Sequence, residues 1–215
     1  MGVLSRAKYL SKLYIFKRRW RKVNPHNRTV ANNIFPIDKV VVGRFTYGPL
    51  DVLTWGADEE KLVIGDLVSI ASGVKFLLGG NHRTDTIFTF PIKVMFSGYS
   101  REAVSKGAIV VEDDVWIGLN SIILSGTYIG KGSVIGAGSV VSGKVPPYSI
   151  AVGNPCKVVR TRFCSPIVDR LLSIDYKQLS EAAIENSVDL LYESLTNENI
   201  DRIIAQVVEE KKEIE

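Results

Sequence analysis

Residues 111–141 read VEDDVWIGLNSIILSGTYIGKGSVIGAGSVV, and this stretch decides the fold. An aliphatic residue returns at every sixth position, namely Val111, Ile117, Ile123, Ile129, Ile135 and Val141. Two places before each of the last five stands a small or β-branched residue, namely Val115, Ser121, Thr127, Ser133 and Ser139. A period of six fits neither a helix face nor a plain alternating strand, but it is typical of a parallel β-helix. Because side chains alternate along a strand, both members of each pair are predicted to point into the coil.

A less regular version of the same spacing comes earlier in the chain. Its members are Val42-Gly43, Ile64-Gly65, Ile70-Ala71 and Phe76. Residues 79–108 interrupt the rhythm, and the ladder resumes in phase at Ile109. We therefore expect a loop that protrudes from an otherwise continuous coil, and its many aromatic residues favour an ordered loop.

Three regions are predicted along the chain. They are a basic helical arm over residues 1–29, the β-helix over residues 30–163 with its loop at 79–108, and a helical region over residues 164–215. The polar segment 24–29 is interpreted as a linker. In the last region, apolar stripes over residues 177–193 and 200–208 indicate helices. We expect these helices to cap an open end of the coil, whose unpaired strand would otherwise invite aggregation.

The net charge of +4 is unevenly distributed. Residues 1–22 carry eight Lys or Arg and no acid, whereas residues 169–215 carry five basic and twelve acidic residues. The arm is therefore either a helix that lies on an anionic membrane surface or a helix that packs on the body with its charged face in solvent. Nucleic acid is not expected as a partner, because the positive charge is confined to the arm.

Several classes of protein are disfavoured by composition. No apolar run approaches the ~20 residues of a membrane span, and the secretory pattern is missing from the start of the chain. The sequence has two cysteines, Cys156 and Cys164, so a location in the reducing cytoplasm fits best. If the arm binds lipid, the protein is expected at the inner face of the membrane. The two histidines, His26 and His82, are too few for a three-histidine metal site in one chain, and no metal is expected to be required.

Three sequence blocks resemble the xenobiotic acetyltransferase branch of the hexapeptide-repeat acyltransferases. They are GNHRTD at residues 80–85, DDVWIG at 113–118 and VGNPCKVV at 152–159, and the similarity runs from about residue 38 to 163. The resemblance implies a left-handed parallel β-helix with a protruding loop and C-terminal α-helices. It also implies a homotrimer with active sites between subunits, and acetyl-CoA as co-substrate.

The branch contains sugar and polysaccharide O-acetyltransferases as well as drug-modifying enzymes. Drug-modifying relatives typically carry a paired-tryptophan helix after the coil, whereas the matching stretch here is Ser173-Ile174-Asp175-Tyr176. Together with the basic arm, this departure favours a hydroxyl of a sugar or surface-polysaccharide precursor as acceptor. The alternative is a chloramphenicol or streptogramin acetyltransferase. A third hypothesis is a non-enzymatic trimeric scaffold or a metal-dependent hydratase.

His82 matches the catalytic histidine of the family. Removing a hydroxyl proton needs a base that titrates near neutrality, so His82 is predicted to be the general base of direct transfer in a ternary complex. Asp85 either orients the imidazole or forms a salt bridge with Arg83. A cysteine acyl-enzyme is the rival mechanism, but Cys156 and Cys164 lie beyond the main hexads rather than in the loop.

Further residues are predicted to contact the two substrates. Candidates for binding acetyl-CoA are Trp116, Gly118, Gly136, Ala137, Gly138, Lys144, Asn154, Pro155, Lys157 and Arg160. The small residues would let a pantetheine arm run close to the chain, and the cations would meet phosphates. Trp116 either covers that arm or seals a subunit contact. Candidates for the acceptor are Asn81 and, near His82 of a neighbouring subunit, Tyr47, Asp51 and Trp55.

Overall fold

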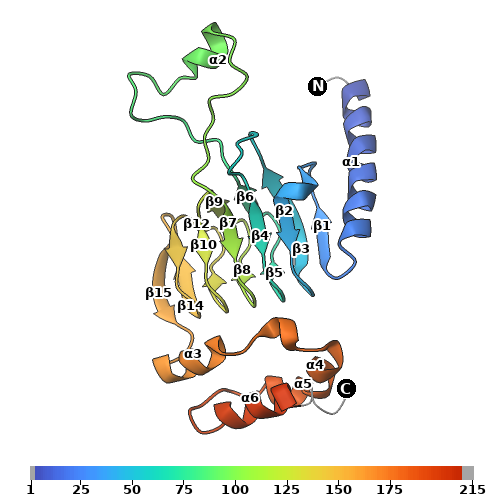
Figure 1. Ribbon diagram of the computed structural model, residues 1–215, viewed down its shortest axis with the longest axis vertical. Coiled ribbons are helices and arrows are strands. Elements are labelled where there is room, and N and C mark those ends of the chain that lie inside the picture. The colour runs from blue at the N-terminus through green and yellow to red at the C-terminus, as the bar shows by residue number, and fades with distance from the viewer. Residues whose placement is uncertain (1–2, 210–215) are drawn as a thin grey trace. The chain divides into compact units, whose positions relative to one another are not determined.

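The computed structural model describes residues 3–209 and divides between Arg160 and Thr161 into two compact units. The first unit contains a coil of short strands, the long helix α1 (Val3–Val23) and a protruding loop (Figure 1). The second unit is helical. The predicted fold class, a parallel β-helix with a protruding loop and C-terminal helices, is confirmed.

Short strands repeat along the coil and stack into three faces (Figure 1). They are β1 (Arg28–Ala31), β2 (Val40–Val42), β3 (Tyr47–Leu53), β4 (Leu62–Ile64), β5 (Ser69–Ile70), β6 (Lys75–Leu77), β7 (Ile109–Val111), β8 (Trp116–Ile117), β9 (Ile122–Leu124), β10 (Tyr128–Ile129), β11 (Val134–Ile135), β12 (Val140–Val141), β13 (Lys144–Val145), β14 (Ser149–Val152) and β15 (Lys157–Thr161). We call the faces A (β1, β3, β5, β8, β11, β14 and β15), B (β2, β4, β7, β10 and β13) and C (β3, β6, β9 and β12).

The register of the strands explains the period of six. Val111 pairs with Ile129, Ile117 with Ile135 and Ile123 with Val141, so one turn of the coil takes 18 residues, or three hexads. Each of these aliphatic side chains is at most 1% exposed. They form one continuous apolar column, in which every member packs against the equivalent residue of the next turn.

The small polar residues of the hexads also point inward, as predicted. Ser121, Thr127, Ser133 and Ser139 are at most 1% exposed. Each hydroxyl donates to a carbonyl oxygen at the wall of the coil, for example Ser133 to Pro146 at 2.7 Å and Ser139 to Gly136 at 2.6 Å. Burial of these hydroxyls is tolerated because each one has its hydrogen bond.

The glycines that follow the aliphatic residues stand where successive turns approach closely. At Gly118 a Cβ atom would lie 2.6 Å from the backbone nitrogen of Ala137 and 2.7 Å from the carbonyl oxygen of Ile135. A side chain at this bend would therefore push two turns of the coil apart.

Helix α1 closes the N-terminal end of the apolar column. Trp20 is 1% exposed, packs edge-on against Phe35, and donates from its indole nitrogen to the Thr29 hydroxyl at 3.0 Å. Phe16 also meets Phe35 edge-on, with ring centroids 5.0 Å apart. The last two turns of α1 thus pack on the body, which is one of the two alternatives for the arm. No helix among residues 3–209 has the length and apolar character needed to span a bilayer.

The prediction of a polar linker at residues 24–29 was wrong. Asn24, Asn27 and Thr29 are all buried, and β1 already begins at Arg28. The Asn27 side-chain oxygen accepts from the backbone N–H and the hydroxyl of Thr29, and the Asn24 amide donates to the Trp20 carbonyl oxygen. Polarity here marks a hydrogen-bonded turn that joins α1 to the coil, because buried polar side chains find partners within the segment.

The loop leaves the coil where face C turns into face B. Ile64 pairs with Val111, 47 residues later instead of 18, so the loop is an insertion that leaves the register of the coil unchanged. Within it lies the short helix α2 (Ile92–Phe96), and its aromatic residues Phe88, Phe90, Phe96 and Tyr99 are exposed in the single chain.

The helical unit has a small core of its own. Its elements are α3 (Ser165–Leu172), the 3-10 turn η2 (Tyr176–Gln178), α4 (Glu181–Asn186), α5 (Val188–Leu191) and α6 (Ile200–Glu209). Outside this unit, in the coil, a second 3-10 turn, η1 (Ile37–Lys39), precedes β2. Helix α6 falls on the apolar stripe at 200–208, and its Ile203 and Val207 bury Leu179. The stripe at 177–193 is divided among η2, α4 and α5. That these helices cap the coil stays a prediction.

The apolar column predicts that substitution by alanine destabilises inward positions more than outward ones. Replacement Ile117→Ala, at a position that is 0% exposed, should lower the free energy of unfolding in urea by about 2–5 kcal/mol. Leu119→Ala, at a position that is 49% exposed two residues later, should cost about 1 kcal/mol or less. Equal losses, followed by circular dichroism, would contradict the inward assignment.

Candidate active site

The root of the protruding loop is fastened to the corner between faces C and B. Asn81 and Val104 form an antiparallel bridge, with N···O distances of 3.1 and 2.9 Å. The Asn81 side-chain amide donates to the Ser125 hydroxyl at 3.0 Å and to the Val104 carbonyl oxygen at 3.2 Å. Asn81 was predicted to bind the acceptor substrate. In this structure its side-chain amide instead ties the loop to the coil.

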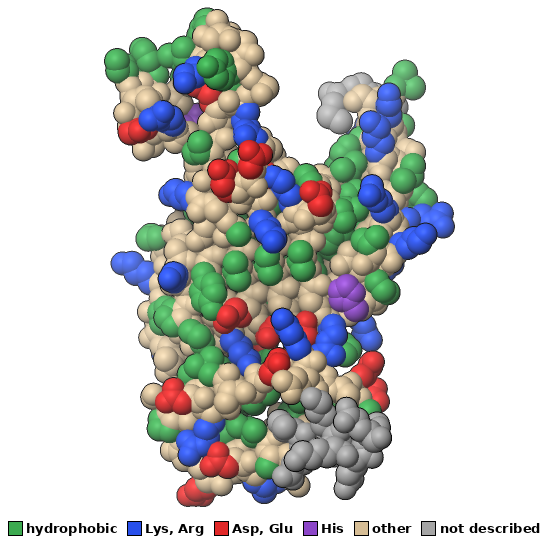
Figure 2. All heavy atoms as spheres, in the orientation of Figure 1, with side chains coloured by type: hydrophobic (Ala, Val, Ile, Leu, Met, Phe, Trp, Pro, Cys, Tyr) green, Lys and Arg blue, Asp and Glu red, His purple; other side chains and the backbone are tan. Residues whose placement is uncertain are grey.

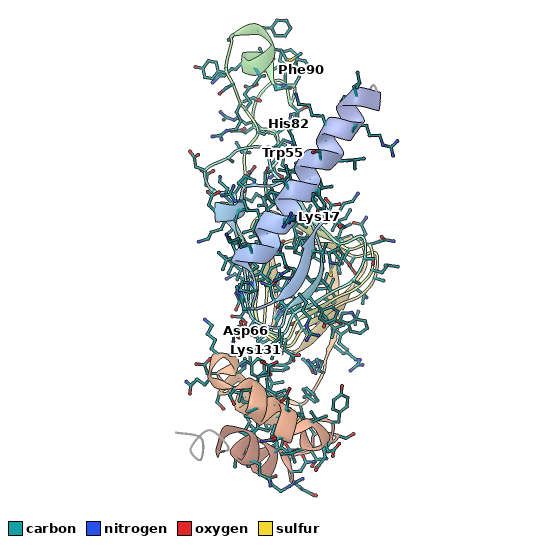
Figure 3. All side chains as sticks on the ribbon, turned by 90° about the vertical axis from the view of Figure 1, so that its right-hand side faces the viewer. Lys17, Trp55, Asp66, His82, Phe90 and Lys131 are labelled. Atoms are coloured by element: carbon teal, nitrogen blue, oxygen red, sulfur yellow. The ribbon has the colours of Figure 1, made fainter. Side chains whose placement is uncertain are left out.

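A cavity of about 310 Å³ lies within the fold of this loop, and Trp55 is the one residue of its lining that comes from outside residues 79–108. Its lining combines aromatic rings with charged and hydroxyl-bearing groups, including Trp55, His82, Phe88, Phe90, Lys93, Arg101 and Glu102. Trp55, His82 and Phe90 lie at the base of the loop and along it in Figure 3. Apolar walls with a few convergent polar groups are typical of a pocket for a small molecule.

The orientation of the His82 ring defines its chemistry. Its Nδ1 lies 2.6 Å from the carbonyl oxygen of Thr89. A carbonyl oxygen only accepts, so Nδ1 carries the proton and donates. In neutral His82 the lone pair then resides on Nε2, which is the atom able to take a proton from a hydroxyl.

Asp85 is held by its neighbour rather than by the histidine. The Arg83 guanidinium donates to both carboxylate oxygens of Asp85, at 3.0 and 2.6 Å. These hydrogen bonds lower the pKa of Asp85 and raise that of Arg83. Of the two alternatives that the sequence left open, the structure shows the salt bridge, and the imidazole is oriented by the Thr89 carbonyl oxygen.

The three other residues predicted to contact the acceptor lie apart, two of them on β3 and Trp55 just after it. Trp55 lines the cavity of the His82 in its own chain, whereas the prediction paired it with His82 of a neighbour. Tyr47, at the start of β3, lies on face A in one outward column with Ser69 and Trp116. Asp51 lies on face C beside Lys75. Of these three residues, Trp55 alone is in the lining of the cavity that contains His82.

The small residues predicted to bind the coenzyme meet at a second corner, between faces A and C. The backbone of Gly138 donates to the Leu119 carbonyl oxygen at 2.7 Å, which brings residues 136–138 beside Gly118. The Gly153 carbonyl oxygen accepts from Val140 at 3.0 Å and adds residues 153–155 to the same corner. A Cβ at Gly138 would meet no atom within 4 Å, so the backbone is open at this residue, whereas a Cβ at Gly118 or Gly136 would meet atoms at 2.6 Å.

The larger residues that were predicted to bind the coenzyme are all exposed, but they do not all lie in the same part of the coil. Trp116 is 56% exposed on face A, outward as predicted. Lys157 and Arg160 lie on β15, at the end of the same face, and Asn154 and Pro155 lie just before them. Lys144 lies on β13, on face B, and is therefore set apart from the other two cations.

Several residues of the cavity were missed by sequence reasoning. Thr89, Lys93, Arg101 and Glu102 all belong to the inserted loop, which has no repeat. Glu102 accepts from the backbone N–H groups of Lys93 and Val94 in the first turn of α2, at 3.1 and 3.4 Å, and so fixes that helix within the loop. No periodic signal could have found them, because their positions depend on how the insertion folds back.

Neither cysteine lies in the cavity lining. Cys156 is half-buried beside the second corner, and burial raises the pKa of its thiol, against a smaller lowering by Ser139. Among residues 3–209, no three His, Cys, Asp or Glu side chains gather as metal ligands.

Comparisons with known proteins agree with this architecture. The sequence model described as bacterial transferase hexapeptide (six repeats) matches residues 108–143. A probable macrolide acetyltransferase of Lysinibacillus sphaericus is 38% identical over 139 residues, which cover 61% of this chain and 77% of that protein. A chloramphenicol acetyltransferase of Klebsiella aerogenes is 36% identical over 144 residues, covering 64% of this chain and 69% of that protein.

Two solved structures are similar throughout most of the coil. One is a hexapeptide-repeat containing acetyltransferase of Vibrio cholerae complexed with acetyl coenzyme A, with a TM-score of 0.52, 28% identity, and coverage of 67% of this chain and 75% of that chain. The other is a maltose O-acetyltransferase of Clostridium difficile, with a TM-score of 0.52, 26% identity, and coverage of 74% and 88%. These similarities confirm the left-handed sense of the predicted β-helix.

The environments of the two thiols predict unequal reactivity. Because burial raises the pKa of Cys156, less of it is thiolate at pH 8, and iodoacetamide should alkylate it more slowly than the exposed Cys164. Mass spectrometry of timed samples measures both rates, and the two should become similar in guanidinium chloride. Faster alkylation of Cys156 in the folded protein would contradict the burial seen here.

Proposed function

Because this chain belongs to the hexapeptide-repeat acetyltransferases, we propose that it transfers the acetyl group of acetyl-CoA to a hydroxyl of a sugar or surface-polysaccharide precursor. The observation that carries the proposal is the hydrogen bond from His82 Nδ1 to the Thr89 carbonyl oxygen, inside a cavity with aromatic walls. That bond leaves Nε2 as the proton acceptor of a residue that lines the cavity.

His82 serves as the general base in this proposal. Nε2 removes the proton of the acceptor hydroxyl as its oxygen attacks the thioester carbonyl carbon. The carbon–sulfur bond then breaks, and the departing thiolate takes the proton back from the imidazolium. A positioned base of this kind contributes about 10²–10⁴-fold to the rate. The Thr89 carbonyl oxygen supports the imidazolium by accepting a hydrogen bond from Nδ1–H, which is the role a carboxylate has in other sites.

The corner between faces A and C is the proposed site of acetyl-CoA. The open backbone at Gly138 has room for a narrow pantetheine arm, with Gly118, Gly136 and Ala137 at the same bend. Asn154 and Pro155 continue this corner, and Lys157 and Arg160 are the cations near its end. Trp116 and Tyr47, which stand in one outward column on face A, are proposed to border this strip. Acetyl-CoA supplies the activated acetyl group when bound.

A homotrimer would join the two corners into one site. In a single chain, the His82 cavity opens at the corner between faces C and B, whereas the Gly138 strip lies between faces A and C. The aromatic residues of the loop are exposed in the single chain, with Phe96 78% exposed. A neighbouring subunit that covers them would bring its own Gly138 strip to the cavity. We therefore place the active sites between subunits.

A drug-modifying acetyltransferase is the alternative, and the names of the two similar proteins favour it. The resemblance to a maltose O-acetyltransferase structure and the Ser173–Tyr176 stretch favour the sugar. The cavity also has the mixed lining that a polyhydroxylated acceptor needs, since Arg101 and Glu102 supply donors and an acceptor beside aromatic walls.

The part of α1 that covers residues 4–15 is proposed to contact an anionic membrane surface. Leu4, Leu10, Tyr14 and Ile15 are between 54% and 88% exposed there. Lys and Arg side chains accompany them along the helix (Figure 2). Exposed apolar side chains contribute to binding at a bilayer interface by burial, and Lys and Arg contribute by attraction to anionic lipids. Trp20 anchors the second half in the coil, so this contact leaves the fold intact.

The acceptor assay tests the main proposal. Purified protein with acetyl-CoA and maltose should release the thiol of coenzyme A. His82→Ala should lower kcat by about 10²–10⁴-fold. The affinity for acetyl-CoA, measured by calorimetry, should stay the same in this variant. His26→Gln, at the other histidine, should keep the rate. Turnover of chloramphenicol with no sugar accepted would overturn the choice of acceptor. Absence of both acetyl-CoA binding and turnover would favour a scaffold.

Vesicle binding tests the role of α1. Lys8→Gln/Lys12→Gln should lower partitioning onto phosphatidylglycerol vesicles by roughly 30-fold, at about 1 kcal/mol per lysine, and salt should do the same. The matched control is Lys61→Gln/Lys75→Gln, which removes the same charge from exposed positions of the coil. Sedimentation with neutral phosphatidylcholine vesicles gives the baseline. Equal partitioning of the two variants would contradict a specific contact through α1.

A further inference from the structure

Glu60 is a buried acid with no role in the chemistry above. It is 1% exposed, in the segment of residues 54–61 that connects β3 with β4. Its Oε1 accepts from the Trp55 backbone N–H at 2.8 Å, and its Oε2 accepts from the Gly56 backbone N–H at 3.0 Å. A buried carboxylate is costly unless its oxygens are satisfied, and here both oxygens are used to hold consecutive amides.

The same carboxylate and the Trp55 ring pack against the bare backbone that leads into the loop. A Cβ at Gly79 would lie 2.4 Å from Glu60 Oε1, and a Cβ at Gly80 would lie 2.7 to 2.9 Å from three atoms of the Trp55 indole. The nearly equal distances show that the face of the ring covers Gly80. His82 follows two residues later, so the indole forms a wall of its cavity.

We propose that Glu60 is a positioning residue of the acceptor site. By holding the backbone of Trp55 and Gly56, it keeps the indole against Gly80, with the free part of the ring available to the acceptor. Trp55 is 42% exposed, which leaves ring surface for contact with an apolar face of a sugar. This inference rests on the proposed function in one respect, namely that the acceptor occupies the cavity of His82.

The chemistry of the side chain explains why an acid is needed. Two N–H groups converge on Glu60, and a carboxylate offers an acceptor oxygen to each. Glutamine has nearly the same shape but only one acceptor oxygen, and its NH₂ group would face the second N–H. Glu60→Gln should therefore release one of the two amides without emptying the space.

Fluorine NMR of the 5-fluorotryptophan-labelled full chain tests the positioning without any acceptor. The Trp55 resonance, assigned with Trp55→Phe, should shift and broaden in Glu60→Gln, while the Trp20 and Trp116 resonances stay. The matched control is Asp66→Asn. Asp66 is 5% exposed and accepts from the backbone of Arg44 at 2.8 Å, but it lies far from Trp55 and His82 (Figure 3). An unchanged Trp55 resonance in Glu60→Gln, or equal changes in all three, would overturn the proposal.

Kinetics separate positioning from general destabilisation. With maltose or chloramphenicol, whichever is turned over, Glu60→Gln should raise the KM for the acceptor about tenfold, the size of one lost hydrogen bond to a charged group, and leave the KM for acetyl-CoA unchanged. In a Trp55→Ala background the same substitution should add nothing, because its effect passes through the ring. An equal rise in both backgrounds would overturn the proposal. If neither acceptor is turned over, the proposed function fails, and the fluorine spectrum still decides the role of Glu60.

Discussion

The structure depends on the requirement that each inward aliphatic side chain meets its equivalent one turn later. Ile117 packs beside Ile135, and Ile123 beside Val141, because both pairs are separated by 18 residues. Any insertion within a strand would shift this register and turn the aliphatic side chains out of the column. Additional chain can therefore be accommodated only at the corners, between one face and the next. The loop of residues 79–108 leaves the coil at such a corner.

The chemistry of the molecule follows from that restriction. Residues 54–61 and the inserted loop leave the coil at the same corner, which is why Trp55 and His82 line one cavity although 27 residues separate them in the sequence. The other corner keeps to the repeat, and the backbone is open there at Gly138. The loop that carries His82 and the corner around Gly138 thus have different origins in the sequence, one from an insertion and one from the hexads. Within a single chain they lie at different corners of the coil.

Sequence reasoning succeeded where the chain repeats and failed where it does not. The inward positions and the point of insertion follow from the period of six, because one rule applies to every turn. The hydrogen-bond partner of His82 could not be predicted in this way. The Thr89 carbonyl oxygen reaches Nδ1 only through the fold of a loop that has no repeat. Asp85 was left between two roles for the same reason. Trp20 stands among basic residues, and nothing in that neighbourhood indicates that it is buried. Its burial depends on packing against Phe35, which is distant in sequence and lies outside the periodic pattern.

The aromatic closure by Phe16 and Trp20 has a consequence for the size of the molecule. A parallel coil with an 18-residue turn has no internal limit on its length, since each turn offers the next the same edge and the same apolar cross-section. With rings of α1 across one end, that cross-section is no longer available to another copy. The helix therefore acts as a terminator, which keeps a fold with the geometry of a fibre from growing into a filament by end-to-end stacking at this end.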